Sequence, residues 1–375
     1  MKLSHTLPRT SAVFDDPNLV SSGGLVPVMA LADAAGLRTL TDERLTVATD
    51  KGANAGLKVA SIVAGMLAGA DSIDDMAVLR HGGMRKVFTS AYAPSTLGSF
   101  LRAFTFGHVR QLDAVAARFL LALASRTRLL GPVAAQATAS TSSKGTTSST
   151  LGGYALGDVD DTIIEVHGHQ KQGAGFGYSR VRGLNAFLAT LTTAGHAPVV
   201  VAQRMRKGSC GSPRGAARLI GDAVKQARRL LGKDQPILVR MDSAFFGGPS
   251  LRAALAGGAD VSVTVRLTAT TKAAIASIED AAWTTIEYTD AIRDEATGAW
   301  ISRAEVAEIA FTAFAAQKSS HQVPGRLVVR RIPDHNAEKN RAAGHGTLFD
   351  VWRFHAFVTT APAEQLDTVA ADQTP

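Results

Sequence analysis

The order of extended and helical segments after residue 153 constrains the fold of this chain more than any other feature. Short runs rich in β-branched residues predict five strands, at 160–166, 184–193, 198–203, 237–242 and 260–267. The first three have short connections and must pair antiparallel, because a parallel pair needs a long crossover. Predicted helices at 214–231 and 249–256 precede the fourth and fifth strands, which are therefore expected to join the sheet as parallel neighbours. The expected fold class is α/β, with a mixed five-stranded sheet and flanking helices.

The segment before these strands has a different character. Residues 1–133 are predicted to be mostly helical, with apolar side chains at helical spacing around residues 97–104. Several short helices separated by Gly and Pro fit either a DNA-reading helix-turn-helix domain or a plain helical packing domain, and both interpretations stay open. Residues 134–153 are rich in Ser, Thr and Gly and are predicted to form a linker, because they hold too little apolar bulk to offset the entropy of ordering.

Four regions follow from this division: a helical N-terminal domain at 1–133, a linker at 134–153, a core at 154–267 and a less regular region at 268–375. In the last region the pattern predicts helices at 272–277 and 303–314. It predicts strands at 326–332 and 354–359. We therefore expect a partly β region after the core.

Composition limits the class of protein. Apolar residues make up 46% of the chain and charged residues 19%, which is enough to bury a sizeable core and excludes global disorder. The single cysteine, Cys210, excludes an intrachain disulfide and a cysteine-based zinc cluster. No apolar run approaches the roughly 18–20 residues of a membrane span, and the N-terminus lacks the apolar segment of a secretory signal. The expected location is the cytoplasm.

Positive charge is concentrated in one part of the chain. Residues 166–235 hold twelve Lys and Arg against two acidic residues, although the net charge of the whole chain is only +8. Such a field favours a polyanionic partner, nucleic acid first. A solvated face on one basic helix explains the same charge equally well.

Acidic residues at strand ends are the candidate catalytic groups. Asp158, Asp160 and Asp161 fall at the start of the first strand, and Asp242 ends the fourth. Carboxylates are hard oxygen ligands that suit Mg²⁺, and Asp160 and Asp242 could share a metal if their strands are neighbours. Alternation along the strand puts Asp158 and Asp160 on one face and Asp161 on the other. The plainer alternative to a metal site is that these acids only end their strands and contact solvent.

The Gly- and Ser-rich turn at 207–215 precedes the basic helix. Its free backbone N–H groups and the helix N-terminus would suit a phosphate. An ordinary loop is an equally good interpretation of the same residues.

Three motifs together resemble the DDE transposases of bacterial insertion sequences: DVDDTIIEVHGHQKQGAGFGYSRVRG at 158–183, RKGSCGSPRGA at 206–216 and ILVRMDSAFFG at 237–247. The resemblance extends over most of residues 95–370. It implies an RNase H-like catalytic domain whose carboxylates bind Mg²⁺ (or Mn²⁺) and which cuts and joins DNA strands at the ends of the element. It also implies DNA as the partner, with a homodimer in the transposition complex.

Carried over by residue, the resemblance assigns the first metal-binding acid to Asp160, with Asp158 in reserve, and the second to Asp242. Basic residues near these acids are the candidates for DNA contacts: Lys171, Arg182, Arg204, Arg206, Lys207, Arg214 and Arg218.

The third acid of the family is a Glu on a helix that follows the inserted, partly β region. Glu338 lies in a polar loop and Glu364 lacks a long helix, so neither fits that role. The expectation is a DDE transposase truncated before its third acid and therefore inactive or nearly so. Two alternatives stay open: a non-catalytic DNA-binding remnant of a transposase, and a metal-dependent nuclease of the same fold.

Overall fold

The computed structural model describes residues 16–48, 50–131, 153–167, 171–287, 303–333 and 352–372. The chain forms two compact units, Met1–Arg128 and Leu129–Pro375. Most of the predicted linker, and the predicted loop around Glu338, lie outside the described residues.

The first unit is helical. Two small cores hold it together, one around Leu79 and Met84 and one around Phe100, and all three side chains are buried. Phe100 packs edge-on against Phe104, at a centroid distance of 5.0 Å. None of the described helices is both long and apolar enough to cross a membrane. The helices are α1 (Leu25–Ala34), α2 (Leu37–Arg44), α3 (Ala55–Leu67), α4 (Met84–Val87), α5 (Pro94–Arg102) and α6 (Phe106–Ala124).

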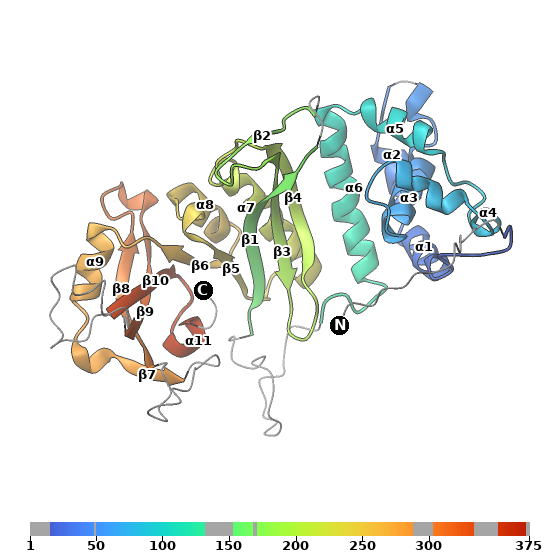
Figure 1. The fold of residues 1–375 in the computed structure, drawn as a ribbon. Helices are drawn as coiled ribbons and strands as arrows, with labels where there is room; N and C mark the ends of the chain where they lie inside the picture. The colour runs from blue at the N-terminus through green and yellow to red at the C-terminus, as the bar shows by residue number, and fades with distance from the viewer. Residues whose placement is uncertain are drawn as a thin grey trace, which may run out of the picture. The chain divides into compact units, whose positions relative to one another are not determined.

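The second unit contains the predicted mixed sheet (Figure 1). Its strands are β1 (Ala155–Glu165), β3 (Arg182–Thr192), β4 (Val199–Lys207), β5 (Ile237–Met241) and β6 (Asp260–Val265). β1 pairs with β3 and β3 with β4 in antiparallel register, whereas β5 is parallel to both β1 and β6. The core order is therefore β4-β3-β1-β5-β6, with a two-stranded meander on one side of β1 and parallel additions on the other. This confirms the predicted α/β class and is consistent with an RNase H-like fold.

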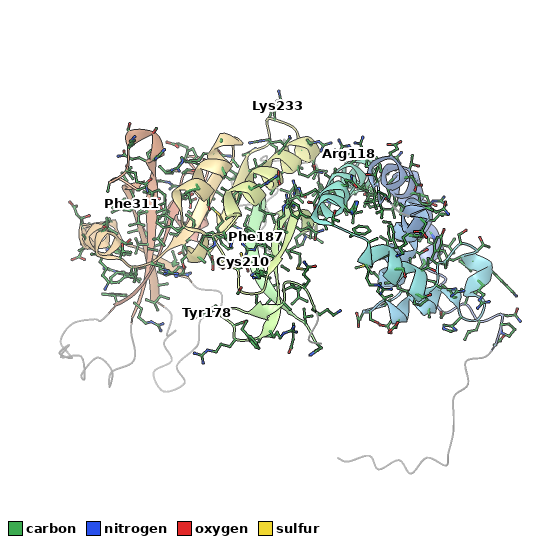
Figure 2. All side chains as sticks on the ribbon, turned by 90° about the horizontal axis from the view of Figure 1, so that it is seen from above. Arg118, Tyr178, Phe187, Cys210, Lys233 and Phe311 are labelled. Carbon is green, nitrogen blue, oxygen red and sulfur yellow. The ribbon has the colours of Figure 1, made fainter. Side chains whose placement is uncertain are left out.

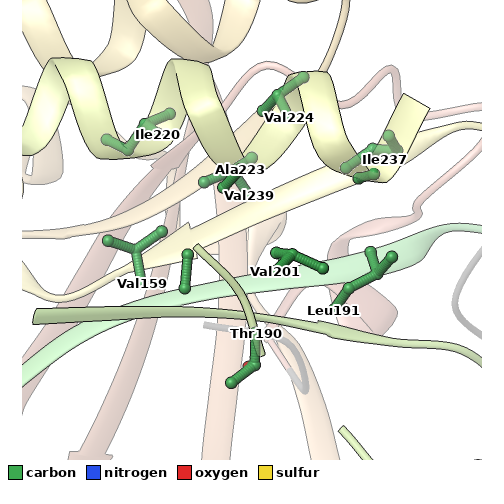
Figure 3. A pocket seen from close by; sticks show the side chains of 12 residues that line it. Val159, Thr190, Leu191, Val201, Ile220, Ala223, Val224, Ile237 and Val239 are labelled. Atoms are coloured by element: carbon green, nitrogen blue, oxygen red, sulfur yellow. The ribbon is translucent and has the colours of Figure 1, made fainter. Parts of the chain in front are cut away.

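Two helices, α7 (Ala216–Leu231) and α8 (Gly248–Ala256), bury their apolar stripes in the largest core of this unit. On α7 the stripe includes Ile220 and Val224, which are fully or nearly fully buried. Figure 3 shows both above Val159 and Val239 of the sheet, where these side chains line a small apolar pocket. The burial of this stripe explains why the helix forms between two strands, because it covers one face of the sheet.

The region after β6 extends the same sheet. β10 (Trp352–Thr359) pairs with β6, followed outward by β9 (Val323–Pro333), β8 (Arg303–Ala313) and β7 (Thr284–Glu287), all antiparallel. With the short β2 (Gly175–Phe176) on β3, the sheet has ten strands among the described residues. The strands predicted at 326–332 and 354–359 lie within β9 and β10, and the helix predicted at 272–277 overlaps α9 (Ala269–Ala276).

The helix predicted at 303–314 is wrong, since this segment is strand β8. Its Ala and Glu residues favour helix, but pairing with β7 on one side and β9 on the other satisfies its backbone as a strand. Val306 and Ala307 of β8 are buried in different cores, as expected for neighbours in a strand covered on both faces.

The opposite face of the sheet has a smaller core. Leu156 of β1 and Leu238 of β5 belong to it together with Phe357 of β10. The short helix α11 (Thr368–Asp372) contributes Ala370 and Ala371 to the same core. This second face is the one on which the candidate catalytic acids lie.

Candidate active site

The pairing of β1 with β5 brings Asp160 and Asp242 together. The two strands are parallel, and their register pairs Val159 with Met241. Asp160 and Asp242 are the residues that come next in sequence, Asp160 within β1 and Asp242 directly after β5. Side chains alternate along a strand, so both acids project on the face of Leu156 and Leu238, opposite to α7.

Local backbone groups orient both carboxylates. Asp242 follows the last residue of β5 and begins a short 3₁₀ turn, where its Oδ1 accepts a hydrogen bond from the N–H of Ala244 at 2.9 Å. Asp160 Oδ1 accepts one from the N–H of Asp161 at 2.7 Å. Each carboxylate has a second oxygen, and both residues are exposed, so a ligand can reach them.

The pKa of the Asp160 carboxyl depends on its surroundings, including the second acid. Partial burial raises the pKa of the Asp160 carboxyl above its usual value, and the negative charges of Asp242 and then Asp161 raise it further. The hydrogen bond from the Asp161 N–H acts in the opposite direction. Two carboxylates that repel each other on one face of a sheet are stabilised by a cation between them. The donor set therefore fits Mg²⁺ or Mn²⁺, which prefer carboxylate oxygens.

Asp158, the reserve residue, has another partner. Its Oδ1 accepts a hydrogen bond from Arg240 Nε at 2.5 Å, and the register places these two residues opposite each other. Arg240 was not predicted from the sequence, although its position two residues before Asp242 on the same strand face was the available signal. The Asp158–Arg240 ion pair therefore lies on the same face as Asp160 and Asp242, two residues earlier in sequence.

Asp161 projects on the other face and has a structural partner. It forms a 2.6 Å ion pair with Arg206, and Asn185 donates a 2.6 Å hydrogen bond to the same carboxylate oxygen. The side chains of Asp161 and Arg206 are only 11% and 10% exposed. Arg206 also lies over the ring of Phe187, 4.2 Å from its centroid, and donates to the carbonyls of Ser212 and Arg214. These contacts fasten the turn before α7 to the sheet.

The basic residues predicted to contact DNA fall into two groups. Arg206 makes the buried contacts just described, Arg204 forms an ion pair with Asp222, and Arg182 donates to the carbonyl of Val166 at 3.1 Å. The other candidates have exposed side chains: Lys171, Lys207, Arg214 and Arg218. No local pattern in the sequence indicates this division, because the partners of Arg204 and Arg206 lie on other elements.

No third acid is grouped with the pair in the part of the chain that the structure describes, where no three His, Cys, Asp or Glu side chains are placed to hold one metal ion. Glu364 is exposed, and Glu338 lies outside the described residues.

The sequence model of one family, described as "Transposase DDE domain", matches residues 151–367, which is more than half of the chain. The chain belongs to this family of DDE transposases. A search of curated proteins gave no match. A solved structure of the piggyBac transposase synaptic complex with hairpin DNA is similar over 96% of this chain and 68% of its own, with 10% identity and a TM-score of 0.38.

Proposed function

We propose that this protein is a transposase that cleaves and transfers DNA strands in the movement of an insertion sequence, with Asp160 and Asp242 as its metal-binding acids. The observation that carries the proposal is the register of the neighbouring parallel strands β1 and β5, which pairs Val159 with Met241, the residues just before Asp160 and Asp242. Membership of the DDE family supports this proposal, because the family is named for its catalytic acidic residues.

In this proposal Asp160 and Asp242 hold Mg²⁺ or Mn²⁺ through their outward oxygens. A metal held by these two carboxylates would activate a water or the 3′-hydroxyl of a DNA strand for attack and would stabilise the leaving oxygen. The N–H groups of Asp161 and Ala244 keep the two carboxylates in place while the substrate binds. Arg240 lies two residues before Asp242, and its guanidinium forms an ion pair with Asp158 on the same face. There it would contact a phosphate of the bound DNA strand.

The DNA partner is proposed to lie along the exposed basic residues Lys171, Lys207, Arg214 and Arg218. Contacts of this kind fix a duplex in position with little sequence preference. Arg204 and Arg206 are not included among the proposed DNA contacts, because their side chains form ion pairs within the protein.

The experiment is a cleavage and strand-transfer assay on supercoiled plasmid carrying the element's ends, with Mg²⁺ or Mn²⁺. Metal-dependent cleavage and joining, lost in Asp160→Asn and in Asp242→Asn but kept in Asp234→Asn, would support the proposal. Asp234 is an exposed acid after α7 and controls for loss of one negative charge.

Other outcomes identify the alternatives. Nicking without joining would support a nuclease of the same fold. Binding of the plasmid with no cleavage under any metal would support a non-catalytic DNA-binding protein.

A further inference from the structure

The hairpin formed by β2 and the start of β3 has a surface that the proposed chemistry does not use. Residues 171–183 contain the two most exposed large apolar side chains in the described part of this unit, Tyr178, which is fully exposed, and Phe176, which is 65% exposed. Figure 2 labels Tyr178 beside the ribbon of this hairpin. Aromatic rings of this size are normally buried or covered by a partner, so two on one short hairpin indicate a binding surface.

The charge around these rings is positive. Lys171, Arg180 and Arg182 are the ionisable side chains other than Tyr178 in residues 171–183, and none of the thirteen residues is acidic. The register places Arg182 directly across from Phe176. One carboxylate, Glu165, lies opposite Gly183 on β1. Exposed aromatic rings between basic side chains match the chemistry of single-stranded nucleic acid, whose bases stack on the rings while its phosphates meet the cations.

Glycines hold this hairpin firmly against the sheet. A Cβ on Gly208 would lie 2.0 Å from the Gly183 carbonyl oxygen and 2.4 Å from that of Gly175, and one on Gly177 would lie 2.5 Å from the Gly208 oxygen. Backbones that approach so closely leave no room for side chains. The N–H of Gly208 also donates to the carbonyl of Gly173 at 3.0 Å. The backbone that carries the two rings is therefore closely packed, which lowers the entropic cost of stacking a base on them.

The hairpin also lies near the candidate metal-binding acids. Its residue Gly183 pairs with Glu165 at the carboxyl end of β1, the strand that carries Asp160. Glu165, the last residue of β1, lies five positions after Asp160, which corresponds to about 17 Å of extended chain. A strand of DNA that reaches Asp160 can therefore also reach the hairpin.

We propose that residues 171–183 form a stacking site for unpaired DNA bases, with Tyr178 as the main platform and Phe176 beside it. This inference rests on the proposed function in one respect, namely that DNA is the partner. It goes beyond that function because it assigns a second kind of contact, to unpaired bases through aromatic rings, next to Lys171 of the exposed basic residues.

The test measures binding of the full chain to a fluorescein-labelled 12-nucleotide oligothymidine and to a duplex of the same length, by fluorescence anisotropy without divalent metal. We expect Tyr178→Ala to weaken oligothymidine binding about tenfold, within the range measured for the removal of one stacking ring, and to leave duplex binding nearly unchanged. Tyr178→Phe keeps the ring and should restore binding. Val200→Ala removes a 48% exposed side chain from β4 and is the matched control.

Three results would overturn the proposal: no binding of oligothymidine by the wild-type chain, equal binding by the wild type and Tyr178→Ala, or an equal weakening in Val200→Ala. If Tyr178→Ala instead changes only the sedimentation coefficient, the surface is a contact between protein copies and the proposal is likewise wrong. The failure of the metal site is distinguishable, because Asp160→Asn and Asp242→Asn should bind oligothymidine like the wild type even if neither residue binds metal.

Discussion

The carboxyl group of Asp160, a proposed metal ligand, should also affect the stability of the fold. Burial and the charges of Asp242 and Asp161 raise its pKa, so the folded state binds the proton more tightly than the unfolded chain does. Stability is therefore lost as the pH rises through this raised pKa, and the charged form costs free energy at neutral pH. We expect Asp160→Asn to unfold at a higher temperature than the wild type at pH 7, and the difference to shrink toward pH 3.

Thermal unfolding between pH 3 and 8 checks this prediction. Added Mg²⁺ should raise the melting temperature of the wild type but not that of Asp160→Asn, because a ligand that binds only the folded state stabilises it. Asp234→Asn controls for loss of one charge. A wild type that is more stable than Asp160→Asn at pH 7 without metal would contradict the account.

Gly208 should tolerate no side chain. Its Cβ would meet the backbone oxygens of Gly183 and Gly175, which cannot move without breaking the β2–β3 pairing. We expect Gly208→Ala to lower the free energy of unfolding by about 1–3 kcal/mol, as overpacking commonly does. Gly211→Ala is the control, since nothing lies within 4 Å of its Cβ position. Equal unfolding midpoints in urea for the two variants would show that the hairpin is not held by this close approach.

At the scale of elements, the Asp161–Arg206 pair joins β1, β4 and the turn before α7. Both side chains are about one-tenth exposed, so removing one partner leaves a buried charge without its ion pair. We expect Arg206→Ala to cost about 3–5 kcal/mol of unfolding free energy, whereas Arg218→Ala on the exposed face of α7 should change it little. Urea denaturation measures both. A cost for Arg206→Ala below about 1 kcal/mol would mean that this pair does not secure the turn.

The elements were predictable where a local pattern coincided with the tertiary environment. The strand β5, with its run of buried apolar residues, and the amphipathic helix α7 follow from the sequence for this reason. The strand β8 does not, because its Ala and Glu residues favour helix and only its pairing with β7 and β9 makes it a strand. The continuation of the core sheet through β6 and β10 is a contact between distant segments, which no local pattern contains.

For the whole second unit, DNA affinity should depend on the exposed basic side chains. We expect the triple variant Lys207→Ala, Arg214→Ala, Arg218→Ala to weaken binding to duplexes of any sequence. The slope of log K against log salt should fall by about 0.9 for each phosphate that the variant no longer neutralises. The matched control neutralises three exposed residues outside this segment, Arg266, Lys272 and Lys318. Equal weakening in the two triple variants would show that only net charge matters.

The site as a whole was predictable to the extent that strand order determines neighbours. The order of strands and helices puts β1 beside β5, which the structure confirms. Alternation along these strands then predicts that Asp160 and Asp242 share one face. The partners of Asp158, Arg204 and Arg206 could not be predicted, because each contact joins segments between 18 and 82 residues apart. The sequence predicts which charges are present, and only the fold decides which of them face solvent.

If Asp160 and Asp242 share one metal ion, that ion can be located by localised cleavage of the protein backbone. Fe²⁺ replaces Mg²⁺ in the purified full chain, and ascorbate with hydrogen peroxide generates radicals that cut the backbone next to the bound ion. The account predicts cuts near residues 160 and 242, suppressed by excess Mg²⁺ and absent from Asp160→Asn and Asp242→Asn. Cuts elsewhere, or cuts that persist in both variants, would contradict it.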